Sequence, residues 1–504
     1  MKKFKAIASA FLAAVSVLSL TACEEEGVNS NSGAPGNATP AITTTTPGTT
    51  TTYAENEGVN EAVKNMDVTA LDDPDIKVEK RIKWLAWNNW IQDETGSAAV
   101  LFKEVYGIPE DGDDPNSAGQ IFENGTVAYA DRYNKLGSLI ASDDSPDLFP
   151  FESYDFPTGA VMGRYNAIDD IIDLDSPKYD GTRDIMKQYE LNGKNYCQVY
   201  TICLNNYMYY RPKLIADIGC DDPYELFKKG EWDWDAFLDI ARKWQNSGEG
   251  RYAIDGYGCD LEFLATTGKP MVSLENGQLV NNLYSTEFDR VQQKMISVLS
   301  SEDLRYPRHT LNNFGINEAA WRNGEILFHA DGDYWVWKDR FAKWAISGKM
   351  DWGPEDVMFV PFPKDPDADE HYVLMKLDTQ MWVKGSKNEA GVKAWYDCMA
   401  TAANDPDVQK ASRQQWLENF HFTDKMLDLH YELTATDGTS PVTLVAEFRN
   451  SIDENHGNNG DAPINSILTQ PYLQGESYTQ LREQNNPQIQ DAIDTMNERI
   501  NSLI

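Results

Sequence analysis

Apolar and polar positions follow two alternating periods along the chain after residue 80. Residues 81–87 alternate and are rich in aromatic side chains, which predicts a strand, and residues 97–106 have the 3.6-residue spacing of a helix. Residues 234–244 show helical spacing behind Asp233, a suitable N-cap. The pattern also predicts strands at 146–151, 199–210, 356–362 and 372–383 and a helix at 389–402. Strands alternating with helices predict an α/β architecture with largely parallel sheets, which bind ligands at the carboxyl ends of their strands.

The N-terminal segment follows neither period. Lysines near the start precede a charge-free, mostly apolar stretch at residues 6–20, which predicts an export signal over residues 1–22 that is too short to span a bilayer. The stretch ends in Leu20-Thr21-Ala22-Cys23, which resembles the lipobox of bacterial lipoproteins. In such proteins Cys23 would carry a lipid and become the mature N-terminus. The alternative is an ordinary secretory signal with an incidental cysteine.

Residues 23–80 are dominated by threonine, serine, asparagine, glycine and proline near their start and remain polar to their end. So little apolar side-chain area cannot offset the entropy lost on ordering a chain. We therefore expect residues 23–80 to form a disordered tether. No later segment has the roughly 18 uncharged apolar residues that a membrane-spanning helix requires.

Composition narrows the class of partner. The chain has 504 residues, of which 41% are hydrophobic, and this is enough for at least two cores or one large bilobal body. Its 44 basic and 80 acidic residues give a formal charge of −36, which repels nucleic acids and anionic membrane surfaces. We expect neither as a partner.

Signatures of catalysis are scarce. The sequence lacks the zinc-protease, serine-hydrolase, phosphate-loop and calcium-loop motifs, and its six histidines do not have metal-ligand spacing. We expect the protein to bind no metal or other cofactor and to have no enzymatic activity. A pair of glycosidase carboxylates cannot be recognised in sequence, because their separation is a property of the fold. Asp331 and Asp333 flank Gly332 and could be catalytic, bind sugar hydroxyls, or stabilise a turn.

Aromatic side chains are the most informative group. The chain has 24 Tyr, 19 Phe and 14 Trp, and most of them should fill cores. A few follow predicted strands instead, namely Trp90 after the first, Phe151 and Tyr154 after the second, and Trp335 after the Gly332 turn. Sugar rings pack their C–H faces on aromatic rings, while their hydroxyls bond carboxylates and amides. This mixture of residues predicts a carbohydrate site.

The order of several short motifs resembles the family 1 extracellular solute-binding proteins, the sugar-capturing lipoproteins of bacterial ABC importers related to maltose-binding protein. The similarity covers about residues 80–504. The motifs that carry it are the tryptophan-rich first strand, residues 145–148, 232–237, 323–328, 331–335 and 360–363, and the helix within 390–402.

This resemblance implies a two-lobed periplasmic-binding-protein fold of type II, with a ligand cleft between the lobes and hinged crossing segments. The implied lobe 1 comprises residues 81–203 and 373–402, and lobe 2 comprises residues 204–372 and 403–504. The chain would cross between the lobes near residues 201–206 and 372–379 and again after about residue 402. The implied function is capture of a carbohydrate, and its delivery to an ABC permease by a monomer anchored to the membrane through Cys23, outside the cytoplasm.

The resemblance also implies a set of ligand-binding residues, with Trp335 as the ring that stacks on sugar. The set consists of Asn88, Asn89, Trp90, Phe151, Glu152, Tyr154, Asp155, Glu262, Phe263, Asp331, Asp333 and Trp335. Two alternatives remain at this point. One is a surface-anchored glycoside hydrolase, and the other is the same fold binding a peptide or another polar solute.

Overall fold

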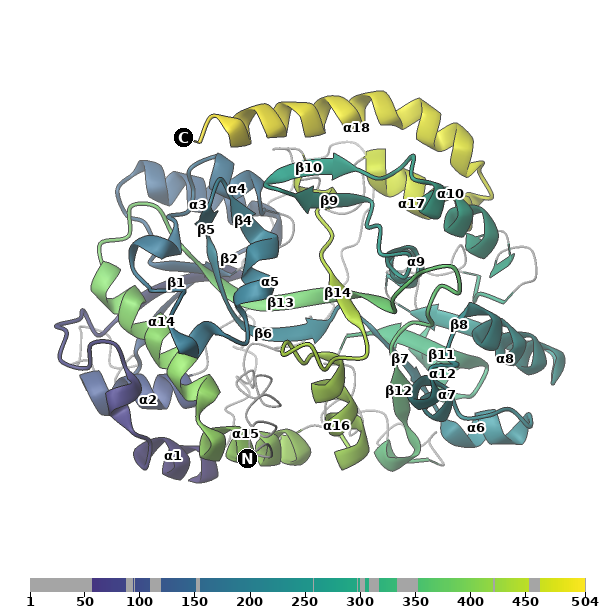
Figure 1. The fold of residues 1–504 in the computed structure, drawn as a ribbon, viewed down its shortest axis with the longest axis horizontal. Coiled ribbons are helices and arrows are strands. Elements are labelled where there is room, and N and C mark those ends of the chain that lie inside the picture. The colour runs from purple at the N-terminus through teal and green to yellow at the C-terminus, as the bar shows by residue number, and fades with distance from the viewer. Residues whose placement is uncertain are drawn as a thin grey trace, which may run out of the picture.

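The structure is a computed structural model in which two β-sheets lie side by side, one in each lobe (Figure 1). A long helix crosses above both lobes in this view. The described residues are 57–87, 94, 96–108, 119–150, 155–256, 258–296, 298–299, 304–307, 317–332, 352–419, 422–452 and 463–503. The two-lobed α/β fold predicted from the sequence is confirmed.

Lobe 1 is built on a sheet whose central strands come from distant parts of the chain. Its strands are β1 (Ile82–Trp87), β2 (Phe122–Val127), β3 (Leu148–Pro150), β6 (Cys197–Leu204), β13 (Tyr372–Trp382) and β14 (Thr443–Val445). β1 pairs in parallel with β2 and β3, while β13 runs antiparallel to β3 and β6. The apolar residues predicted for the first strand include Trp84, which is 2% exposed and lies in the core.

Lobe 2 has a four-stranded sheet of order β12-β7-β11-β8. Its strands are β7 (Tyr207–Tyr210), β8 (Tyr252–Gly256), β11 (Ile326–Asp331) and β12 (Met358–Val360). β8 and β11 are parallel, but β7 is antiparallel to both β11 and β12. The prediction of largely parallel sheets was therefore wrong for the strands next to the lobe crossings, because a chain that passes from one sheet into the other enters it without a crossover helix.

The first crossing lies inside the single strand that was predicted over residues 199–210. The structure divides this run into β6 and β7, and Asn205 and Asn206 join them. Asn205 donates its backbone N–H to the carbonyl of Leu374 in β13 at 2.8 Å. The return crossing leads from β12 to β13, so the two crossing segments are hydrogen-bonded to each other.

The predicted helices are present with small changes at their ends. The 97–106 helix is α2 (Ser97–Tyr106), the 234–244 helix is α8 (Trp234–Asn246), and the 389–402 helix is α14 (Glu389–Asn404). Asp233 accepts a hydrogen bond from the backbone N–H of Ala236 at 2.9 Å, as expected of an N-cap. Further helices include α3 (Arg132–Ala141), α4 (Thr158–Val161), α5 (Arg183–Met186), α6 (Pro212–Asp217), α7 (Pro223–Lys229), α9 (Cys259–Ala265), α10 (Thr286–Val291), α12 (Glu318–Arg322), α16 (Asp424–Leu433) and α17 (Pro463–Gln474).

The predicted tether is shorter than residues 23–80. Residues from Glu57 onward are folded, beginning with α1 (Glu57–Lys64), in which Val59 and Val63 are 1% and 2% exposed. These valines are four residues apart and therefore share one face of the helix, which packs against α2 and α15 (Pro406–Asn419). The prediction failed because so short an apolar stripe becomes ordered only through packing on another part of the fold.

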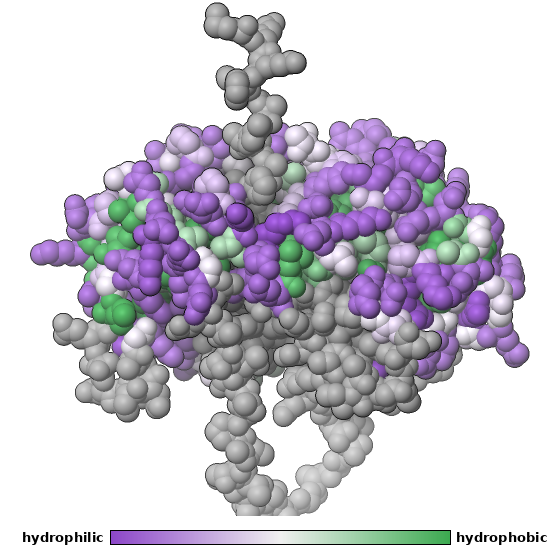
Figure 2. Space-filling model, turned by 90° about the horizontal axis from the view of Figure 1, so that it is seen from below, coloured by the Kyte–Doolittle hydropathy of each residue, from purple (hydrophilic) through white to green (hydrophobic). Residues whose placement is uncertain are grey.

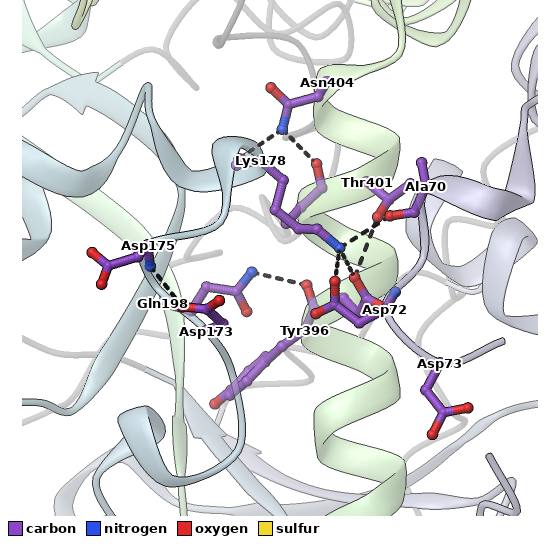
Figure 3. Close-up of polar contacts among 12 residues, drawn as sticks. Ala70, Asp72, Asp73, Asp173, Asp175, Lys178, Gln198, Tyr396, Thr401 and Asn404 are labelled. Carbon is purple, nitrogen blue, oxygen red and sulfur yellow. Dashed lines mark hydrogen bonds and ion pairs between the residues drawn. The ribbon is translucent and has the colours of Figure 1, made fainter.

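A partly buried charge cluster fastens the segment after α1 to lobe 1 (Figure 3). Lys178 donates to the carbonyl of Ala70 at 3.1 Å and to the carboxylate of Asp72 at 2.8 Å, and it also bonds Asp397 of α14. Asp397 in turn accepts the backbone N–H of Asp72 at 2.7 Å. Burial opposes the charge on Lys178, but the hydrogen bonds from Asp397 and Asp72 outweigh it and raise the pKa of the ammonium group. Residues 70–72 are thus part of lobe 1.

The predicted lobe boundary after residue 402 also moves. α15 packs against α14 and α1, on the side of lobe 1. α16 belongs to the other side, because Lys228 of α7 bonds the carboxylate of Glu432 and the hydroxyl of Tyr207 lies 2.7 Å from Nδ1 of His430. We therefore place the third crossing between α15 and α16.

The surface of the described residues is mostly hydrophilic (Figure 2). Figure 2 shows hydrophilic side chains over most of the described part of this face, with apolar ones in small separate groups. The large hydrophobic side chains that are exposed among the described residues are Val68, Ile108, Met162 and Tyr284. Within the same ranges, none of the helices combines the length and apolar character needed to cross a bilayer.

Candidate functional site

Three strands end where the sequence predicts ligand contacts. β1 and β3 are parallel neighbours in lobe 1, and β11 lies in the sheet of lobe 2, so their carboxyl ends belong to both lobes. Most predicted ligand residues directly follow these ends and lie outside the described residues. They are Asn88, Asn89 and Trp90 after β1, Phe151, Glu152 and Tyr154 after β3, and Asp333 and Trp335 after β11. The predicted lipid-bearing Cys23 also lies outside them.

Asp155 is buried in lobe 1 and is bonded there by protein groups. Its side chain belongs to a residue that is only 2% exposed, and it forms an ion pair with Arg164. The hydroxyl of Tyr165 donates to its second carboxylate oxygen at 2.5 Å. Because both oxygens are already bonded by protein groups, we no longer expect Asp155 to bind a ligand hydroxyl.

Asp331 stabilises the turn that follows β11. One carboxylate oxygen accepts the backbone N–H of Gly332 at 2.8 Å, and the other lies 3.3 Å from Nε2 of His329. The hydroxyl of Tyr209 in β7 donates to the carbonyl of Gly332 at 3.0 Å. Asp331 is 2% exposed, so of the three roles open for it in the sequence, the turn is the one that its contacts support.

The neighbouring strand end is equally constrained. Gly256 closes β8 with φ at 142°, and a Cβ atom there would lie 2.2 Å from the carbonyl oxygen of Ala330 in β11. Only glycine allows β8 and β11 to approach this closely. The carboxyl edge of the lobe 2 sheet is therefore a rigid base for the residues that follow it.

Glu262 lies at the hinge and does not reach toward solvent. It is 1% exposed on α9 and accepts a hydrogen bond from the side chain of Asn205 at 2.6 Å. Burial raises the pKa of Glu262 to about 8, while hydrogen bonds from the Asn205 and Asn206 side chains oppose the shift. A carboxyl group with this pKa is largely protonated at neutral pH, so it contributes little charge to a ligand site.

Phe263 is a core residue. It is fully buried, with its ring centroid 5.4 Å from that of Phe237 in α8 and 5.1 Å from that of Phe362. The ligand-binding role predicted for Phe263 was wrong, because this face of α9 packs on the hydrophobic core of lobe 2.

Sequence reasoning missed a polar cluster around the crossings. Glu447 accepts backbone N–H groups from Met271 at 2.8 Å and Val272 at 3.1 Å, and burial raises the pKa of its carboxyl group. The positive charge of Arg449 favours the ionised form of both Glu447 and Glu262 and so opposes the rise in their pKa. Glu262 and Glu447 are about 185 positions apart in sequence, so no local pattern could have shown that they lie near the same arginine. Their contacts make the cluster a structural element of the hinge.

A metal centre is not formed by the described residues, since His, Cys, Asp and Glu side chains do not gather there in groups of three or more. The described residues also place their buried carboxylates in ion pairs, turns and backbone contacts. Chemically, the arrangement is a pair of rigid sheet edges joined by hydrogen-bonded crossings, and the segments that would face a ligand follow those edges.

The family model described as "Bacterial extracellular solute-binding protein" matches residues 122–406, which is more than half of the chain. The chain belongs to this family, whose members are binding proteins and act outside the cytoplasm. Among curated proteins, none matches this chain at the sequence level.

Solved structures agree on the fold. An ABC substrate-binding protein of Listeria monocytogenes in complex with cycloalternan is 15% identical, with a TM-score of 0.52 over 84% of this chain and 99% of that one. A cyclo/maltodextrin-binding protein complexed with maltotetraose is 15% identical, with a TM-score of 0.52 over 84% of this chain and 98% of that one. UgpB of Mycobacterium tuberculosis in complex with glycerophosphocholine is 15% identical, with a TM-score of 0.52 over 74% of this chain and 91% of that one. At such identities the similarity establishes the two-lobed fold alone and does not identify the ligand of this protein.

Proposed function

We propose that this protein captures a carbohydrate, namely an oligosaccharide, between its lobes and delivers it to the permease of an ABC importer. The observation that carries the proposal is the position of the aromatic residues in the sequence. Trp90, Phe151 and Trp335 each follow within a few residues of the carboxyl end of a strand, and these strands belong to both lobes.

Physical chemistry favours a sugar at such a place. Strand ends of α/β sheets are the usual ligand sites of this architecture, and aromatic rings with nearby amides and carboxylates suit both the faces and the hydroxyls of a sugar. Asn88, Asn89, Glu152 and Asp333 supply the polar groups in the proposed site. A ligand that touches both lobes stabilises their closed arrangement and can thereby signal its presence to a permease.

Attachment to the membrane is the second part of the proposal. A lipid on Cys23 followed by the polar residues 24–56 would hold the folded body outside the cytoplasm, and the body would act as a monomer. About 33 flexible residues give a root-mean-square reach of roughly 30 Å. Metabolic labelling with a radioactive fatty acid tests this part, because Cys23→Ala should abolish the label.

Two measurements test the ligand: a thermal-shift screen to find it, and calorimetry to measure its affinity. The screen of mono- and oligosaccharides, with maltotetraose as the first probe, should find at least one sugar that raises the melting temperature. Trp335→Ala should then weaken its binding roughly tenfold or more, because the stacked ring is lost. Tyr284→Ala removes an exposed aromatic ring in lobe 2 and should leave the affinity unchanged. Absence of binding by every sugar would overturn the proposal.

Two other functions make different predictions. A glycoside hydrolase would convert the oligosaccharide into shorter products during incubation, whereas a binding protein returns it intact. A receptor for another polar solute would respond to glycerophosphocholine or to a peptide in the same screen, and the structurally similar UgpB binds the former.

A further inference from the structure

The last helix, α18 (Tyr478–Asn501), contacts both lobes. It runs across the top of the molecule in Figure 1, from α17 and α10 at one end to α4 at the other. With 24 residues at 1.5 Å each, it extends about 36 Å. Pro487 lies inside this helix and removes one of its backbone hydrogen bonds, which weakens it locally. Asn486 and Gln490 on either side of the proline bond Asn281, and Asn497 bonds Leu279, so the helix is held against lobe 2 along most of its length.

The first half of α18 is fastened to lobe 2. The hydroxyl of Tyr478 donates to the carbonyl of Leu283 at 3.1 Å, and Arg482 forms an ion pair with Asp289 of α10. Asn281, at the end of β10 (Gln278–Asn281), donates its side-chain amide to that of Asn486 at 2.9 Å. α10 packs on α9, which lies in the core of lobe 2, so this half of α18 moves with lobe 2.

The last turn of α18 is fastened to lobe 1. The side chain of Asn192 donates to the carbonyl of Ile500 at 2.5 Å, and Arg499 lies 3.5 Å from the sulfur of Met162. Asn192 forms the turn between β4 (Glu190–Leu191) and β5 (Lys194–Asn195), and Met162 directly follows α4. Ile500 is fully buried, whereas the contact between Arg499 and Met162 lies on the surface.

Two hairpin turns meet beneath this helix end. The turn between β9 (Val272–Glu275) and β10 belongs to lobe 2, and a Cβ atom on its Gly277 would lie 3.7 Å from the backbone nitrogen of Asn192. Asn497 of α18 bonds both the N–H and the carbonyl of Leu279 in β10, at 2.7 Å and 2.9 Å. The helix therefore covers the place where hairpins of the two lobes approach each other.

We propose that α18 is a brace that limits how far the lobes can separate. Rotation of lobe 1 away from lobe 2 must break the contact of the last turn, because the remaining helix is held by lobe 2 over several turns. Loss of the Asn192 hydrogen bond and the Arg499 contact then shifts the ligand-free equilibrium toward more open forms. One hydrogen bond of this kind changes such an equilibrium by roughly threefold to tenfold.

The test measures the distance between the lobes in ligand-free protein. Spin labels are placed on the exposed residues at Lys135→Cys in α3 and Lys229→Cys in α7, in the full chain with Cys23→Ser and Cys220→Ser. The test variant is Asn192→Gly with Arg499→Ala, since glycine adopts the positive φ of residue 192 without strain. Electron paramagnetic resonance should show a roughly threefold to tenfold larger population at long distances than without these two changes.

The control variant is Asn486→Ala, which removes a contact of α18 within lobe 2 and should leave the distance distribution unchanged. If the double variant melts too early to be measured, the single change Asn192→Gly decides the question. A distribution identical to that of the labelled parent would overturn the proposal, and so would an equal shift in the Asn486→Ala control. The measurement needs no ligand, so it is independent of whether the protein binds a sugar.

Discussion

The two ends of the folded chain are attached to the body in different ways. The N-terminal segment is held by a partly buried cluster of charges around Lys178, and all of its partners lie in lobe 1. The C-terminal helix α18 is held by amide groups, an apolar stripe and one ion pair between Arg482 and Asp289, and its partners lie in both lobes. An attachment to one lobe stabilises that lobe alone, whereas an attachment to both also affects how the lobes are placed relative to each other.

The strongest way to separate the two attachments is Lys178→Ala. This change leaves the carboxylate of Asp397, which is 3% exposed, without its cation, so the free energy of unfolding should fall by about 3 kcal/mol. Urea denaturation measures the loss. The distance between the lobes should stay the same, because no partner of Lys178 in this cluster lies in lobe 2.

A matched control for that experiment is Lys187→Ala. Lys187 also pairs with an aspartate, but the side chains of this pair are 60% and 84% exposed, so its loss should change stability by less than about 0.5 kcal/mol. Equal effects of the two changes would show that the Lys178 cluster does not hold the N-terminal segment.

Glu262→Gln examines the hinge that lies between the two attachments. The pKa of Glu262 is raised to about 8 by burial, so the wild-type protein loses stability as the pH rises from about 4.5 to 8, and the penalty is complete above that range. Glutamine carries no charge, so the variant should be more stable than wild type by about 4 kcal/mol at pH 9 and by less than about 1 kcal/mol at pH 5.

Thermal unfolding of both proteins across this pH range provides the measurement. Glu249→Gln serves as the control, since Glu249 is exposed and the change should follow the wild-type profile. A constant difference between Glu262→Gln and wild type at all pH values would contradict the assignment of a raised pKa.

The smallest expected effect belongs to Asn497→Ala. This change removes two hydrogen bonds to the backbone of Leu279 and should cost about 1 kcal/mol of stability. Gln488→Ala on an exposed face of the same helix should be nearly neutral. Calorimetric melting of the two variants compares them directly, and equal melting temperatures would mean that Asn497 does not fasten α18 to β10.

The sequence predicted the elements whose signals are local. The helix at 97–106, the helix at 389–402 and the cap at Asp233 depend on spacing and on one hydrogen bond, and the structure contains them. The long polar α18 was not predicted, because its apolar residues form only a narrow stripe. That stripe consists of Ile489, Ile493, Met496 and Ile500, all nearly or fully buried.

The candidate site was harder to predict for a different reason. Asp155, Asp331 and Glu262 have the side chains that a sugar site needs, but each is buried and bonded to protein groups. Burial is a property of the tertiary structure, and a sequence rich in carboxylates does not reveal which of them it will affect. The aromatic residues after the strand ends remain a prediction that binding experiments must test.

The position of β13 has a consequence for how the protein assembles. It pairs with β3 through residues that are more than 200 positions apart in sequence, and it also pairs with β6 and β14. The sheet of lobe 1 therefore stays incomplete until Val445 of β14 has left the ribosome, by which time every strand of the lobe 2 sheet has been made. Closing so long a loop is slow, so we expect lobe 1 to be the late step of folding. In this member of an extracellular family, lobe 1 therefore cannot reach its native state until its last strands have been synthesised.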